Sequence, residues 1–138
     1  MNKCNLEFHH LGLAVKKPEK AMNFLKVLGY NFKEPVYDPL QKINLILCES
    51  STMPFVELIY SSANDADSPI RNILKNSNEL IYHMCYESPS AKESIKLLKN
   101  NGVHVLGIAK PKPAILFDGK KVSFYKVDGF GIIEILEK

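Results

Sequence analysis

An internal repeat constrains the fold of this chain more than any other feature of its sequence. Residues 10–14 align with residues 83–87 at an offset of 73, and the segments that follow them align at the same offset. A later apolar segment around Glu57 resembles one around Glu134, at an offset of 77. Each copy therefore carries a histidine near its start and a glutamate near its end, and we expect two similar structural units.

The predicted secondary structure follows the same order in both halves. Each half begins with a strand, continues with a helix that opens at a proline and ends at a glycine, and finishes with three strands. The first helix has four apolar residues at helical spacing, which predicts one buried face: Ala21, Phe24, Leu25 and Leu28. The pattern predicts an α+β fold in which two tandem βαβββ modules, at about residues 6–62 and 79–137, form a single domain, residues 1–138.

The composition indicates a soluble globular protein and argues against nucleic acid and membranes as partners. The 138 residues are 46% apolar and 24% charged, as in ordinary soluble globular proteins. The net charge is only +3 and Arg71 is the sole arginine, which argues against nucleic-acid recognition because arginine forks usually carry it. Three cysteines without close pairing indicate no disulfide framework and favour a reducing cytoplasm. Apolar runs are too short to span a membrane.

The repeated histidines and glutamates are the candidate site. His10 and His83 each share a strand face with small residues, which leaves space in front of each imidazole. Glu57 and Glu134 interrupt strongly apolar strands, where a carboxylate is costly unless it is paired or bound to a metal. Two imidazoles and two carboxylates on a curved sheet are a common donor set for a divalent ion. The alternative is that the histidines are hydrogen-bonded core residues and the glutamates edge charges; the repetition favours the metal.

Other candidate residues have a simpler interpretation that we favour. Cys85 is conceivable as a thiol nucleophile, but a small buried side chain beside the cavity explains it better. His9 faces away from His10 and is interpreted as structural, while His104 has no acidic partner nearby in the sequence. A cluster of lysines is interpreted as a solvated loop rather than a site for the phosphates of a carrier such as coenzyme A: Lys110, Lys112, Lys120 and Lys121.

The chain resembles the vicinal oxygen chelate superfamily of glyoxalases, bleomycin resistance proteins and dioxygenases. Within it, the likeness is greatest to methylmalonyl-CoA epimerases and small glyoxalase-like proteins. The segments that carry it are residues 8–15, 56–59, 67–70, 82–87, 119–124 and 133–136. The resemblance implies a cup-shaped mixed sheet with helices on its outer face. It also implies a metal held by four residues: His10, Glu57, His83 and Glu134.

The resemblance further implies a metal-dependent proton-transfer enzyme that acts like methylmalonyl-CoA epimerase through a metal-stabilised enolate. The expected ion is divalent Ni, Co, Zn or Mn, and Glu134 is the expected base. The substrate would be a small thioester or thiol adduct, and the protein a cytoplasmic homodimer. Two alternatives remain: isomerisation of a thiol hemithioacetal, as by lactoylglutathione lyase (glyoxalase I), and non-catalytic ligand binding or antibiotic sequestration.

Three features of the sequence depart from the patterns of these relatives: one residue, one loop and one helix. Leu40 stands near the place where epimerases of this type carry a second acidic residue, and Asp38 could replace it if its loop bends inward. The family's His-Gly-Lys loop reads Asp-Gly-Lys at residues 118–120. The first helix has Lys20 and Lys26 but no arginine of the kind that clamps a glutathione carboxylate.

Overall fold

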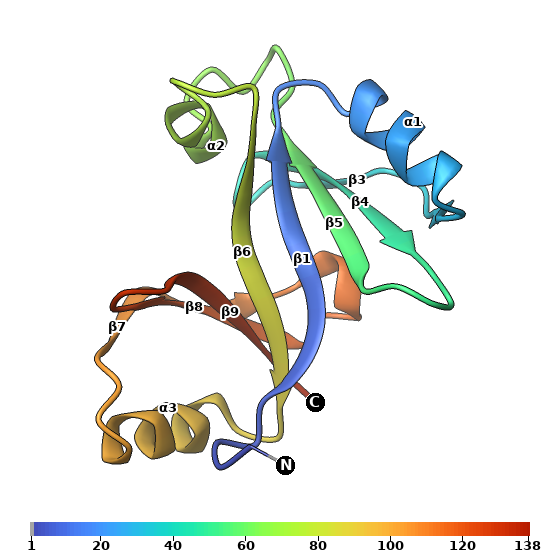
Figure 1. The fold of residues 1–138 in the computed structure, drawn as a ribbon. Coiled ribbons are helices and arrows are strands. Elements are labelled where there is room, and N and C mark those ends of the chain that lie inside the picture. The colour runs from blue at the N-terminus through green and yellow to red at the C-terminus, as the bar shows by residue number, and fades with distance from the viewer. Residues whose placement is uncertain (1) are drawn as a thin grey trace. The chain divides into compact units, whose positions relative to one another are not determined.

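The computed structural model describes residues 2–138, which contain nine strands, three α-helices and one short 3-10 helix at Ile115–Phe117 (Figure 1). The strands are β1 (Glu7–Val15), β2 (Asn31–Phe32), β3 (Val36–Asp38), β4 (Ile43–Glu49), β5 (Phe55–Tyr60), β6 (Glu79–Ser88), β7 (Val105–Pro113), β8 (Lys121–Val127) and β9 (Gly131–Glu137). The helices are α1 (Glu19–Val27), α2 (Pro69–Ile73) and α3 (Ala91–Asn100). Among these residues, no helix has the length and apolar content that crossing a membrane requires.

The nine strands form one open mixed sheet, and the pairing pattern repeats in the two halves. In the first half β1 pairs in parallel with β5, and β4 runs antiparallel to β2, β3 and β5. In the second half β6 pairs in parallel with β9, and β8 runs antiparallel to β7 and β9. The predicted α+β class with a mixed sheet is therefore confirmed, with β3 as an extra short strand in the first half.

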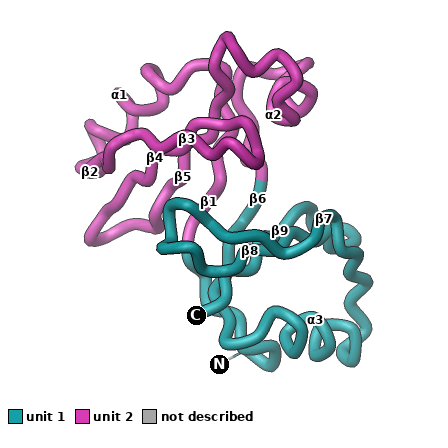
Figure 2. The backbone as a smooth tube through the Cα atoms, turned by 180° about the vertical axis from the view of Figure 1, so that it is seen from behind, with its two compact units in different colours: residues 1–9, 83–138 teal, residues 10–82 magenta. Residues whose placement is uncertain are grey.

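The chain separates into two compact units (Figure 2). We call residues His10–Tyr82 the central unit, and the residues up to His9 together with His83–Lys138 the terminal unit. The boundaries between the units fall inside β1 and β6. The strand order is β2-β4-β5-β1 in the first half and β6-β9-β8-β7 in the second.

The core of the central unit corrects the predicted inner face of α1. Leu25 is buried and packs with Ala21 and Met22 in this core, whereas Phe24 is 65% exposed. Successive residues of an α-helix are rotated by about 100°, so Ala21 and Met22 flank the direction of Leu25 while Phe24 lies about 100° away from it. The spacing predicted a buried stripe correctly, but its centre lies towards Met22. Leu28, also predicted to be inside, is 41% exposed.

One of two apolar clusters in the terminal unit lies where α3 meets β9, and the other joins Cys85 to residues of β8 and β9. Ala91 on the helix clusters with the buried side chains of Ile133 and Ile135. The helix begins with a side-chain cap, because the hydroxyl of Ser90 accepts a hydrogen bond from the backbone N–H of Glu93 at 3.3 Å. The cap stabilises the first turn of the helix, and the buried face packs the helix on the strand that carries Glu134.

Candidate metal centre

In the central unit, the register of β1 and β5 brings a buried histidine beside a buried glutamate. Gly12 is the parallel partner of Glu57, and His10 lies two residues earlier on the same face of β1. The Nε2 atom of His10 is 3.7 Å from a carboxylate oxygen of Glu57. Their exposed fractions are 0% and 5%, so both polar groups lie out of reach of bulk water.

The terminal unit repeats this arrangement with β6 and β9. Cys85 is the parallel partner of Glu134, and His83 lies two residues before it. The Nε2 atom of His83 is 3.7 Å from Oε1 of Glu134, and these residues are 2% and 4% exposed. The ring of Phe124 meets the His83 imidazole edge to face, with centroids 5.4 Å apart. The sequence repeat therefore corresponds to equal strand register and equal geometry in the two units.

Burial sets the charge state of the pair in the terminal unit. It lowers the pKa of His83 to about 4, so this imidazole is neutral near pH 7. It raises the pKa of Glu134 to about 7, against the opposing effects of a hydrogen bond from Cys85 and the charge of Lys112. A neutral imidazole forms no ion pair, and 3.7 Å is too long for a hydrogen bond between these two side chains.

The same distance fits two ligands of one metal ion. Nitrogen and oxygen ligands lie about 2.0–2.2 Å from an ion such as Zn²⁺, which places two of them about 3 Å apart at right angles and about 4 Å apart when opposite. The separation of 3.7 Å in each unit falls between these limits. A neutral imidazole next to a buried carboxylate is also a chemically suitable donor pair for a divalent cation. The residues present in each unit therefore fit the metal that the sequence predicts.

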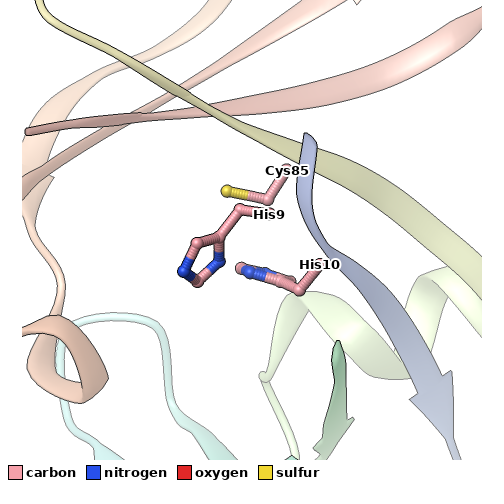
Figure 3. A group of neighbouring side chains, drawn as sticks. All are labelled: His9, His10 and Cys85. Atoms are coloured by element: carbon pink, nitrogen blue, oxygen red, sulfur yellow. The ribbon is translucent and has the colours of Figure 1, made fainter. Parts of the chain in front are cut away.

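His9, the neighbour of His10 in β1, has contacts within the terminal unit. Its Nε2 atom is 3.5 Å from a carboxylate oxygen of Glu87, and its ring meets that of Phe117 edge to face at 5.2 Å. Burial lowers the pKa of His9, and the charge of Glu87 opposes this effect. A ring nitrogen of His9 also lies within 4.8 Å of the thiol of Cys85, so the structure places His9 beside a residue of this site, and the prediction that it is turned away is wrong. Figure 3 shows the consecutive side chains of His9 and His10 on β1 and that of Cys85 on β6.

Asp38 holds a turn in the central unit. Its carboxylate accepts hydrogen bonds from the backbone N–H groups of Leu40 and Gln41 and from the side-chain amide of Gln41, at 2.9–3.2 Å. These bonds stabilise the connection between β3 and β4, as aspartate commonly does in turns. Leu40 is 67% exposed. The carboxylate of Asp38 is thus committed to its own loop, which argues against its use as the second acid.

Lys112 has a different environment from the one predicted from the sequence. The sequence predicts a solvated loop around Lys112, but β7 continues through this residue to Pro113, and Lys112 is half-buried. Its charge lowers the pKa of Glu134, which makes it a contributor to the electrostatics of this site. The prolines at positions 111 and 113 hid the strand, because proline usually ends strand pairing except at edges. β7 lies at the end of the strand order, where proline is tolerated.

The sequence matches a protein family over most of its length. A family model described as Glyoxalase/Bleomycin resistance protein/Dioxygenase superfamily matches residues 9–124. A search of curated proteins finds no significant match.

Comparison of the fold with solved structures gives many matches. The structure of methylmalonyl-CoA epimerase from Mycobacterium tuberculosis has a TM-score of 0.78 and 17% identity, with 99% of this chain and 91% of that chain covered. A hypothetical protein from Bacillus halodurans has a TM-score of 0.76 and 23% identity, with coverage of 96% and 94%. Streptomyces coelicolor methylmalonyl-CoA epimerase in complex with 2-nitronate-propionyl-CoA has a TM-score of 0.72 and 14% identity, with coverage of 96% of both chains. At these identities the likeness is one of fold.

Proposed function

Because the chain belongs to the Glyoxalase/Bleomycin resistance protein/Dioxygenase superfamily, the vicinal oxygen chelate proteins, we propose that it is a metal-dependent proton-transfer enzyme that acts like methylmalonyl-CoA epimerase. The observation that carries this proposal is the pair of buried histidine and glutamate side chains that occurs at the same register position in each unit. Structural neighbours of the chain are methylmalonyl-CoA epimerases, which supports this choice of reaction.

In this proposal one divalent ion (Ni, Co, Zn or Mn) is held by both pairs together, through His10, Glu57, His83 and Glu134. When bound, it would supply Lewis-acid polarisation of a carbonyl oxygen of the substrate. Two neutral imidazoles and two carboxylates would balance the charge of such an ion, and an ion that takes more than four ligands could also bind substrate oxygens. The substrate class we propose is a small thioester or thiol adduct, and the protein acts as a cytoplasmic homodimer.

Glu134 is the proposed catalytic base. It accepts a proton from the carbon next to the substrate carbonyl, and the electron pair of the broken C–H bond moves towards the carbonyl oxygen. Inversion would then need a second acid that delivers a proton to the other face of that carbon, while Glu134 passes its own proton to solvent. Burial raises the pKa of Glu134 to about 7 in the metal-free protein, and a bound cation would oppose this effect by favouring the ionised carboxylate, which is the form that accepts a proton.

A second candidate function is isomerisation of a thiol hemithioacetal, as by glyoxalase I. Inversion requires groups on both faces of the reacting carbon, whereas one carboxylate can move a proton between adjacent carbons along a single face. Asp38 is committed to its turn and Leu40 is exposed, so neither supplies a second acid. This observation favours the isomerisation, and a non-catalytic sequestering protein is the third possibility.

Incorporation of solvent deuterium, followed by NMR, tests these functions. We expect metal-loaded protein to exchange the α-proton of methylmalonyl-CoA, and Glu134→Gln to reduce the rate by at least about a hundredfold because the base is lost. Glu79→Gln, a change of the same kind at an exposed position of β6, is the control and should keep full activity. Exchange only in the adduct of methylglyoxal and glutathione would replace the epimerase proposal with the glyoxalase one. Exchange in neither substrate, with every candidate metal, would contradict both.

A further inference from the structure

The central unit has a second candidate site, in a pocket formed by the end of β1, the start of α1, the segment after β5, and α2. Its volume is about 680 Å³, within the range of small-molecule sites. Four basic side chains line it: Lys16, Lys17, Arg71 and Lys75. None of the proposed metal ligands lines this pocket. Lys16 follows His10 by six residues, which places it about 20 Å farther along the direction of β1.

The basic residues give the pocket a net positive charge that is not neutralised by neighbours. Among residues 2–138, no ion pair with a carboxylate is formed by any of the four. A single acidic residue, Glu19, also lines the pocket from the first turn of α1. Four cations against one anion within one small volume attract a ligand with more than one negative charge.

Arg71 is held in place without losing its charge. Its Nε atom donates to the carbonyl of Asp65 and its Nη2 atom donates to the carbonyl of Ser62, both at 2.9 Å. Neither bond uses Nη1, so that part of the guanidinium can meet an anion. A guanidinium that is already oriented loses little conformational entropy when it binds a phosphate, and its planar N–H groups match phosphate oxygens. The sole arginine of the chain is therefore built into this pocket.

The floor of the pocket is apolar. Ile70 and Leu74, from α2 and its end, lie at its base and are each only 2% exposed. Half-buried Tyr60 and exposed Ala63 also line the pocket and add accessible apolar surface. An inorganic ion would leave this apolar surface unused, whereas an apolar group attached to the phosphate would cover it. Charge and apolar surface together describe an organic phosphate.

We propose that this pocket binds a phosphate-bearing organic molecule, with the phosphate on the basic side chains and the apolar body against the apolar lining around Tyr60 and Ala63. The site is independent of the proposed metal centre and of the proposed reaction. Its recognition rests on the charge of the four basic residues and on the orientation of Arg71.

An NMR titration of the ¹⁵N-labelled full chain with phenyl phosphate and with inorganic phosphate, at pH 7 and constant ionic strength, tests the proposal. We expect phenyl phosphate to shift the amide signals of residues around Arg71 and to bind at least about fivefold more tightly than inorganic phosphate, because only the former covers the apolar floor. Arg71→Gln should weaken phenyl phosphate binding about tenfold. Lys75→Gln should weaken phenyl phosphate binding about threefold. The side chain of Lys75 makes no hydrogen bond to the surrounding loop, so this variant still tests the proposal if Arg71→Gln disturbs the fold.

A substitution of opposite sign and two controls separate a specific site from general attraction by charge. Glu19→Gln removes the only acidic group of the pocket and should tighten phenyl phosphate binding about threefold. Lys26→Gln and Glu34→Gln make the same charge changes at exposed positions outside the pocket and should leave the affinity unchanged. Equal binding of the two phosphates would overturn the apolar part of the proposal. Absence of binding, or an equal effect of Lys26→Gln and Lys75→Gln, would overturn the site itself.

Discussion

Burial moves the pKa values of His83 and Glu134 in opposite directions, although the two side chains lie 3.7 Å apart. The folded protein therefore favours a neutral imidazole and a protonated carboxyl. The unfolded chain favours charge on both groups at mildly acidic pH. In the metal-free protein this pair costs stability, as expected for polar groups that are arranged for binding rather than for folding.

We predict that the free energy of unfolding depends more strongly on pH when Glu134 is substituted than in the wild type, where the effects of Glu134 and His83 partly cancel. Glu134 has its pKa raised from 4.5 to about 7, so its contribution to stability is greatest below pH 4.5 and decreases as the pH rises towards 7. His83 has its pKa lowered from 6.5 to about 4, so its contribution is greatest above pH 6.5 and is lost as the pH falls towards 4. Between pH 4.5 and 6.5 the two changes oppose each other.

Urea denaturation in the presence of a chelator measures this effect. In Glu134→Gln, the free energy of unfolding should fall by up to about 1.4 kcal/mol per pH unit more steeply than in the wild type as the pH decreases from 6.5 to 4.5. Glu79→Gln should follow the wild type. Equal slopes in all three proteins would show that burial does not shift the two pKa values as described.

At the scale of secondary structure, the register of the parallel strands decides where the polar side chains meet. The repeat of His and Glu, and the strands that carry them, could be predicted from the sequence because a two-residue period and a fixed offset are visible in it. The direction in which α1 turns its apolar stripe could not, because Phe24 and Met22 are both apolar and only packing distinguishes them. The extent of β7 was also hidden, since it depends on the edge position of the strand.

The packing of the central unit leads to a prediction for two apolar residues. Leu58 on β5 is 0% exposed and belongs to the core, whereas Phe24 on α1 is 65% exposed. Leu58→Ala should lower the free energy of unfolding by about 2–5 kcal/mol because it leaves a cavity. Phe24→Ala should change it by less than about 0.5 kcal/mol. Urea denaturation measures both, and a loss of more than 2 kcal/mol in Phe24→Ala would show that α1 is packed differently.

At the scale of the whole molecule, each of the two copies of one structural pattern carries one buried histidine and one buried glutamate. The two pairs of residues could be predicted from the sequence because each copy repeats them, and in each pair the imidazole and the carboxylate lie 3.7 Å apart. Their role as metal ligands stays a prediction. The second acid of an epimerase could not be assigned in this way: Asp38 has the right chemistry in the sequence, but its hydrogen bonds commit it to a turn. The union of the two pairs on one ion remains the central proposal.

Metal content per chain, measured by elemental analysis after dialysis of the folded protein, tests this proposal most directly. His10→Gln in the central unit and His83→Gln in the terminal unit are the informative variants, and His104→Gln, at an exposed position, is the control. Far-UV circular dichroism verifies that each variant is folded. We predict one ion per chain in the wild type and the control, and loss of that ion in either single variant. Two ions per chain, or a full complement retained by one of the two variants, would contradict the account.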